Sequence, residues 1–248
     1  MGIVLILGIA GILSNKRWVR SQFSLESTVN IPSGCMDVDT FAWGDTHESK
    51  RLCVNSFQLD RYEASWKVYA KQAKTEILQQ LQYQDSSGNP ILIDGAPDLP
   101  ITGLTWKEAD QYCQDRSMRL PSFDEWEYVA RSGISTVSIA DPKTVKANLN
   151  GEFQDDIYPA ISPVGSFPAN AFGVHDMIGN TEEWTSTCHD DFGNIISPDS
   201  VRQADWRADI VCISGGGAWN TSRAWFSHGS QERPFGHNPS SLGVRCAK

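Results

Sequence analysis

The chain has 248 residues, 40% of them apolar, and a formal net charge of −9 at pH 7. This length and composition suit one soluble domain with a sizeable core, and they exclude a disordered chain or a polytopic membrane protein. The negative charge, which no stripe of Lys and Arg offsets, excludes nucleic acid as an expected partner and favours metal cations.

The N-terminal segment is apolar. Gly2 to Leu13 is a continuous run of twelve residues, followed by Lys16, Arg17 and Arg20. Such a run is too short to span a bilayer but suits the hydrophobic region of a signal peptide. A basic start and an A-x-A cleavage site are missing. We interpret residues 1–20 as an export signal whose start can lie upstream, with a membrane anchor as the second interpretation and a buried strand as the third.

Three helices are predicted before residue 133. The first covers about residues 64–82, where Val68, Ala73, Ile77 and Leu81 recur at roughly helical spacing.

The other two helix starts are marked by capping boxes. Thr105 precedes Glu108 by three residues, and Ser122 precedes Glu125 in the same way. The first capped helix should run to about Arg116. Its side chains Ala109, Tyr112 and Cys113 should face the core.

The second capped helix should end at Gly133 and turn inward Trp126 and either Val129 or Ala130. Its acids Asp124 and Glu127 could suggest acid–base chemistry, but on a helix they form a surface pair. From Gly133 to the C-terminus, short apolar pieces separated by Gly, Pro, Asn and Asp predict small strands and long ordered loops.

Six cysteines show neither a C-x-x-C pair nor the spacing of a zinc site. An even number without metal spacing favours disulfides and therefore an oxidising compartment. The alternative is six reduced thiols in the core of a cytosolic protein.

Four ordered blocks give the sequence a family resemblance. They are LTWKEADQYCQDRSMRLPSFDEWEYVARSG at 104–133, NAFGVHDMIGNTEEWTS at 170–186, SGGGAW at 214–219 and LGVRCA at 242–247. In order and spacing they resemble the formylglycine-generating enzyme family, also called the sulfatase-modifying factor domain. The resemblance covers about residues 36–248. It implies a single loop-rich α+β domain of low regular content, distantly similar to C-type lectins.

The same resemblance argues against the family's copper chemistry. Family enzymes oxidise a sulfatase cysteine with copper held by two cysteines, and soft thiolates are the ligands that copper(I) requires. The matching positions are Thr221 and Phe226. The resemblance shows three further departures nearby: Ala218 stands where a serine is usual, Glu182 replaces the tryptophan of a W-E-W motif, and Ser241 replaces an asparagine. Copper is therefore not expected.

Iron, which related enzymes hold through histidines, is not expected either. None of the five histidines forms an H-x-x-x-H pair, although His228 and His237 could meet across a loop.

Calcium is the expected structural cofactor, because hard oxygen ligands recur within one short segment. The resemblance implies side-chain ligation by Asp176 and Glu183 and backbone ligation by Gly179 and Thr181. The alternative is that these acids only cap turns. A second family site corresponds less closely and would use Asn148, Leu149, Asp156 and Tyr158.

Disulfide pairing is also implied by the resemblance, since family members join the cysteines that match Cys113 and Cys246. Cys35–Cys53 and Cys188–Cys212 then follow by elimination and sequence proximity. Each would close a loop of roughly twenty residues and add roughly 3 kcal/mol in the chain-entropy model. Arg245 resembles the family's near-terminal arginine, for which a buried ion pair or a clamp on carbonyl oxygens is expected.

The family's substrate groove corresponds to the segment from the glycine run to about Pro239. Its glycines allow tight backbone packing, and Trp219 is expected to anchor the core. Beyond it, a recognition surface is predicted from aromatic and basic residues, the types that carry interface energy: Arg223, Trp225, Phe226, His228 and Arg233. The alternative is a merely structural loop.

The function expected from the sequence is that of a non-catalytic binding or scaffolding module. We expect it to be periplasmic or extracellular, with an N-terminal membrane anchor as a further option, and to bind an unknown protein or small molecule at the C-terminal groove. One alternative is an oxidase of altered chemistry, related to the siderophore-maturation branch. The other is a retroelement-diversified ligand-binding protein, because such proteins vary the C-terminal block of this lectin-like domain.

Overall fold

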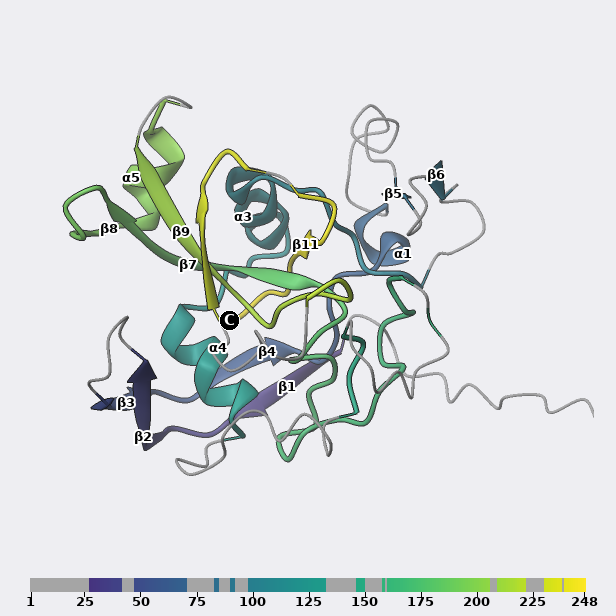
Figure 1. The fold of residues 1–248 in the computed structure, drawn as a ribbon, viewed down its shortest axis with the longest axis horizontal. Coiled ribbons are helices and arrows are strands. Elements are labelled where there is room, and N and C mark those ends of the chain that lie inside the picture. Colours follow the sequence, from purple (N-terminus) through teal and green to yellow (C-terminus); the bar gives the residue numbers. More distant parts are fainter. Residues whose placement is uncertain are drawn as a thin grey trace, which may run out of the picture.

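The computed structural model describes residues 27–41, 47–70, 83–84, 90–91, 98–132, 146–149, 158, 160–205, 209–221, 230–237 and 239–248. Within them, short helices and small sheets are connected by long irregular segments, as the mixed α+β prediction requires (Figure 1). The predicted export signal at residues 1–20 lies outside the described residues.

Two small antiparallel sheets come first in the described part of the chain. Strand β1 (Thr28–Ile31) pairs with β4 (Phe57–Asp60), and β2 (Gly34–Phe41) pairs with β3 (His47–Val54) in a hairpin. A further antiparallel pair joins β5 (Tyr83–Gln84) to β6 (Pro90–Ile91).

The main sheet has the strand order β10–β9–β7–β11, with the short β8 also paired to β7. Its strands are β7 (Glu182–Asp190), β8 (Ile195–Ile196), β9 (Ile210–Gly215), β10 (Ser230–Pro234) and β11 (Leu242–Gly243). Strand β11 runs parallel to β7, whereas the other pairs are antiparallel. Thus β11, near the C-terminus, lies beside the strand that continues the Asp176–Glu183 segment.

Both capping boxes form as predicted. The hydroxyls of Thr105 and Ser122 accept from the backbone N–H of the residue three positions on, and Glu108 and Glu125 reach back to the cap N–H groups. These caps open α3 (Trp106–Asp115) and α4 (Phe123–Ala130).

The side chains predicted to face inward from the two capped helices are buried, except Ala130, which is half-buried. The acids of α4 have structural roles, because Asp124 pairs with Lys50 and Glu127 pairs with Arg131.

Two further helices are short. Helix α1 (Trp66–Tyr69) occupies the start of the long helix predicted over residues 64–82, and Val68 is buried as expected. The remainder of that prediction, including Ala73, Ile77 and Leu81, lies outside the described residues, as does Gly133. Helix α5 (Pro198–Gln203) lies beside the main sheet.

The core consists of two clusters of buried apolar side chains. One surrounds Trp106 and Trp184, between α3 and the main sheet. The other surrounds Trp126, between α4 and the β2–β3 hairpin. Gly215 lies directly against the Trp126 ring, where an added Cβ would come within 2.6 Å of ring atoms. The tryptophan packed at the glycine run is therefore Trp126; Trp219, the expected anchor, is only half-buried.

Three disulfides join all six cysteines: Cys35–Cys53, Cys113–Cys246 and Cys188–Cys212. These are the expected pairs. They are typical of proteins that fold in an oxidising, extracytoplasmic environment. None of the helices in the described part of the chain is long and apolar enough to cross a bilayer.

The C-terminal segment is threaded through the fold. Its backbone bonds with β4, through Asp60 N–H to the Cys246 carbonyl at 2.8 Å, and with Arg119, whose N–H donates to the Ala247 carbonyl at 2.9 Å. Figure 1 places the C-terminus near the centre of the molecule, close to α4. This threading brings Arg245 into the interior.

Candidate functional site

Arg245 forms the centre of a buried group of charges. Its side chain is fully buried and pairs with Glu183, with Nε 2.7 Å from Oε2 and Nη2 2.5 Å from Oε1. Nη2 also donates to the His175 carbonyl at 2.9 Å. Burial opposes the charged form of Arg245, but the Glu183 carboxylate outweighs it and raises the arginine pKa. Both expected roles, buried ion pair and carbonyl clamp, are present in one side chain.

Glu63 is a second buried acid beside this pair. Its carboxylate accepts from the Thr181 hydroxyl at 2.7 Å, from the Thr181 N–H at 3.1 Å and from Asn180 Nδ2 at 2.7 Å. Burial, followed by repulsion from Asp176 and Glu183, raises the Glu63 pKa well above its ordinary value.

Asp176 is the third buried acid, and one of its oxygens lacks a partner. The residue is 6% exposed, and its Oδ2 accepts from the Gly165 N–H at 2.6 Å. Its Oδ1 is buried and makes no hydrogen bond of normal geometry, although the Phe167 backbone N–H is near enough to favour the charged form. Burial raises the Asp176 pKa to about 6. Because one arginine faces three acids, the group has an excess of negative charge when all of them are ionised.

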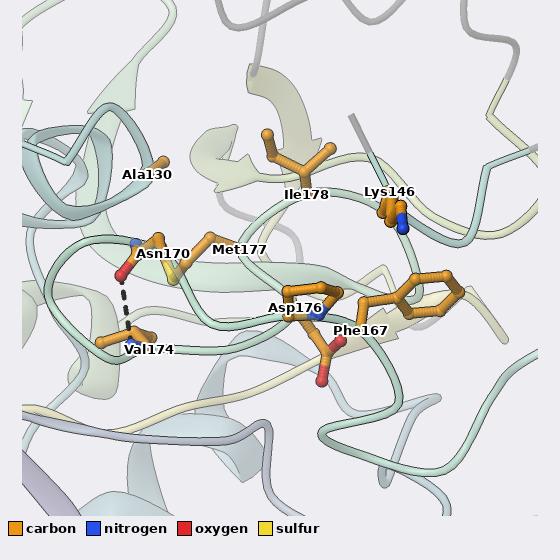
Figure 2. Close-up of a pocket in the computed structure, with 9 residues that line it drawn as sticks. Ala130, Lys146, Phe167, Asn170, Val174, Asp176, Met177 and Ile178 are labelled. Atoms are coloured by element: carbon orange, nitrogen blue, oxygen red, sulfur yellow. Dashed lines mark hydrogen bonds between the residues drawn. The ribbon is translucent and has the colours of Figure 1, made fainter. Parts of the chain in front are cut away.

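A pocket of about 130 Å³ lies beside Asp176 (Figure 2). Its lining is mostly apolar and comprises Ala130, Lys146, Phe167, Pro168, Asn170, Val174, Asp176, Met177 and Ile178. The Asn170 side chain is already engaged, since Oδ1 accepts from the Phe172 and Val174 N–H groups and Nδ2 donates to the Val129 carbonyl. The lining thus includes two charged side chains, Lys146 and Asp176, and one oxygen of Asp176 has no hydrogen-bond partner.

The backbone around Asp176 is shaped for close approach of oxygen atoms. Asp176, Gly179 and Asn180 all have positive φ. The Asn148 carbonyl accepts from the Asn180 N–H at 2.8 Å and lies so near Gly179 that an added Cβ would come within 2.3 Å of it. Asn148, which is predicted for the second calcium site, therefore lies against Gly179, which is predicted for the first.

The residues predicted for the first calcium site fit a cation unequally. Asp176 offers a desolvated carboxylate oxygen without a normal hydrogen bond, which a hard cation would satisfy. Glu183 differs, because Arg245 takes both of its oxygens and Trp126 Nε1 also donates to Oε2 at 2.7 Å. The Thr181 side chain is bonded to Glu63, so Thr181 could contribute only its carbonyl.

The second predicted calcium site is described in part. Asn148 and Leu149 are buried, and Asn148 Nδ2 donates to the Ala160 carbonyl at 2.7 Å. Tyr158 accepts a hydrogen bond from Ser166 at 3.4 Å. Asp156 lies outside the described residues. Over the ranges described above, no group of three or more His, Cys, Asp or Glu side chains is arranged to hold a metal.

The predicted recognition surface is described at one residue, Arg233; Arg223, Trp225, Phe226 and His228 lie outside the described residues. Arg233 pairs with Glu182, with Nη2 2.8 Å from Oε1 and Nε 3.1 Å from Oε2. Glu182 is 3% exposed and also accepts from Ser214 Oγ at 3.1 Å. Arg233 thus ties β10 to β7 across β9.

The turn after the glycine run is closed by Thr221. Its hydroxyl accepts from the Ala218 N–H at 2.8 Å, and its own N–H donates to the Ala218 carbonyl at 2.8 Å. This turn and β10 are the described segments on either side of residues 222–229 in the sequence.

Sequence reasoning missed two residues that organise the site, Glu63 and Asn180. Asn180 is fully buried, and its Oδ1 accepts from the Ser162 N–H at 2.8 Å and from Asn148 Nδ2 at 3.2 Å. It thereby joins three segments that are distant in sequence. The sequence offered one sign of the role of Asn180: it is an asparagine directly after Gly179, and asparagine tolerates the positive φ that this position has.

A family model described as "Sulfatase-modifying factor enzyme 1-like domain" matches residues 16–248. The chain is 30% identical over 171 residues to the formylglycine-generating enzyme of Bos taurus, covering 61% of this chain and 44% of that protein. It is 29% identical over 160 residues to the inactive C-alpha-formylglycine-generating enzyme 2 of Mus musculus, covering 60% of this chain and 49% of that protein. The chain thus spans about half the length of these relatives.

Among solved structures, PvdO from Pseudomonas aeruginosa superposes with a TM-score of 0.63 at 20% sequence identity. The match covers 89% of this chain and 93% of that chain. At this identity the likeness establishes the shared fold.

Proposed function

Because the chain belongs to the sulfatase-modifying factor enzyme 1-like family, we propose that it is a periplasmic or extracellular member that binds a ligand without catalysing formylglycine formation. One observation carries the proposal: all six cysteines are joined in three disulfides. Copper(I) in this family is held by two thiolates, and none of the six cysteines is a free thiol that could bind it.

Thr221 supports the same conclusion. It stands where the resemblance places a copper-binding cysteine, and its hydroxyl closes a turn with Ala218. A hydroxyl engaged in this way is a structural group and a weak ligand for a soft metal. The names of the relatives do not decide the matter, since one is called a formylglycine-generating enzyme and another an inactive one.

We place the ligand site at residues 222–229. The described residues on either side of them in the sequence are held in place, because Thr221 closes a turn with Ala218 and the Glu182–Arg233 pair fixes β10. Arg233 then serves to hold the groove, while Arg223, Trp225, Phe226 and His228 supply aromatic and basic groups for a protein or small-molecule ligand.

The catalytic part of the proposal is tested by mass spectrometry. A peptide carrying the sulfatase recognition motif is incubated with purified protein, copper and oxygen, and cysteine is followed for conversion to formylglycine. A family enzyme with both copper-binding cysteines, assayed in parallel, shows that the conditions are competent. We expect no conversion above the no-enzyme control, and turnover would overturn the proposal.

We further propose that a structural calcium ion binds at Asp176, with the carbonyls of Gly179 and Thr181 as additional ligands. The support is the buried Asp176 oxygen that lacks a normal hydrogen bond and the surplus of acids around Arg245. Glu183 adds negative charge to the site but no free ligand oxygen, because Arg245 binds both oxygens of its carboxylate.

Calcium binding is tested by thermal melting of metal-stripped protein. Binding to the folded state alone stabilises it by about 2.7 kcal/mol at a hundred times Kd. We expect added calcium to raise the Tm of the wild type and to leave the Tm of the Asp176→Asn variant unchanged. A wild-type Tm that does not respond to calcium would exclude the site.

A further inference from the structure

The Cys35–Cys53 disulfide differs from the other two in its surroundings. Cys35 and Cys53 are both exposed, whereas the remaining four cysteines are fully buried. The two residues lie directly opposite each other on the β2–β3 hairpin. This disulfide is therefore on the solvent face of a small sheet.

The opposite face of the hairpin holds the sheet to the core. Met36, Val38, Leu52 and Val54 are buried against the Trp126 cluster, and they alternate along the strands with the exposed cysteines. Side chains of a strand point to alternate faces, so the disulfide and the apolar contacts lie on opposite sides. The ladder and this apolar face can persist when the disulfide opens.

From this arrangement we propose that Cys35–Cys53 is a thiol-exchange site, which accepts a small thiol or the cysteine of a thiol–disulfide oxidoreductase while the domain stays folded. An external thiolate attacks one Sγ, forms a mixed disulfide with it and releases the other cysteine as a thiolate. A second external thiolate then attacks the external sulfur of the mixed disulfide and releases the protein cysteine as a thiolate. Two external thiols are then oxidised to their disulfide, and Cys35 and Cys53 are both reduced.

The Cys188–Cys212 disulfide provides an internal control. It too joins directly opposite residues of antiparallel strands, β7 and β9, and it spans 24 residues against 18 for Cys35–Cys53. The two disulfides share topology and similar loop length. Cys188 and Cys212 are fully buried, so exposure is the main variable between the two sites.

The test uses the full oxidised protein in native buffer with reduced glutathione as the probe. Samples are acid-quenched at intervals, free thiols are alkylated, and each of the six cysteines is quantified by peptide mass spectrometry. Because exchange requires access of the attacking thiolate, we expect Cys35 and Cys53 to react roughly tenfold faster or more than Cys188 and Cys212. Equal rates for the two disulfides would overturn the proposal.

Two variants separate exchange from unfolding. Cys53→Ser leaves Cys35 as a single exposed thiol, which should form a mixed disulfide with oxidised glutathione in the folded protein. The double variant Cys35→Ser/Cys53→Ser should retain a cooperative melting transition and both buried disulfides. If instead the double variant is unfolded, or wild-type Cys35 and Cys53 react only under denaturing conditions, the site is structural and the proposal fails.

Discussion

Asp176 is the side chain whose environment conflicts most with its charge. Its pKa of about 6 lies above the ordinary value of 3.8 because the carboxyl is buried. An acid whose pKa is raised on folding stabilises the folded state below the unfolded pKa, and this contribution is lost as the pH rises through the folded pKa. Glu63, with its own raised pKa, acts in the same direction.

In metal-stripped protein, the wild type should therefore lose stability as the pH rises, and Asp176→Asn should remove this part of the pH dependence. We expect the free energy of unfolding of the wild type, relative to the variant, to fall by about 2 kcal/mol between pH 4 and pH 7. Urea titrations of both proteins at several pH values measure this difference. A difference independent of pH would show that the Asp176 carboxyl is not desolvated.

Glu182 and Arg233 form a second ion pair, whose partners are separated by 51 residues; the Glu182 side chain is 3% exposed and that of Arg233 is 24% exposed. Removing Arg233 leaves the Glu182 carboxylate buried without its cation, whereas removing both leaves no charge. Arg233→Leu should lower the free energy of unfolding by about 3 kcal/mol, and Glu182→Leu/Arg233→Leu should cost less than the two single changes summed.

The matched control is the exposed pair Asp37–Arg51, whose side chains are 56% and 66% exposed. Its removal should change the free energy of unfolding by less than about 1 kcal/mol. Additive effects at Glu182 and Arg233, measured in the same denaturant series, would contradict a coupled buried pair.

At the level of elements, the contact between β9 and α4 depends on a missing side chain. Gly215→Ala would place a Cβ within 2.6 Å of the Trp126 ring, so it should lower the free energy of unfolding by about 1 to 3 kcal/mol. At Gly236 an added Cβ meets nothing within 4 Å, so Gly236→Ala should stay within about 0.5 kcal/mol of the wild type. Thermal melting of both variants checks the contrast, and similar losses would refute the packing argument.

Elements defined by local sequence could be predicted. The starts of α3 and α4 follow from Thr105 and Ser122, because a capping box needs residues only three positions apart. The disulfide pattern also followed, from the resemblance and from the proximity of cysteines in the chain.

The interior of the candidate site could not be predicted in the same way. Glu63 bonds to Thr181 across 118 residues, and Arg233 bonds to Glu182 across β9. No local pattern specifies such partners. Burial of Glu182 could have been suspected, since it replaces a tryptophan of the resembled motif, and a buried carboxylate requires a cation nearby.

At the level of the whole molecule, the Cys113–Cys246 disulfide ties α3 to the C-terminal segment across 133 residues. Closing so long a loop restricts the unfolded chain strongly, so Cys113→Ala/Cys246→Ala should lower the free energy of unfolding by about 5 kcal/mol in the chain-entropy model. Denaturant titration against the wild type measures the loss. A change below about 1 kcal/mol would show that the threaded segment is held by its other contacts.

The position of residues 242–247 constrains when the protein can fold during synthesis. They supply β11, the counter-charge of Glu183 and the half-cystine that joins α3, and their backbone bonds with β4. While these residues are still inside the ribosome, β7, β4 and α3 lack the partner that this segment supplies. The core therefore cannot close until residues 242–247 have left the ribosome, and until then chaperones and oxidoreductases would meet a chain in which Glu183 lacks its arginine.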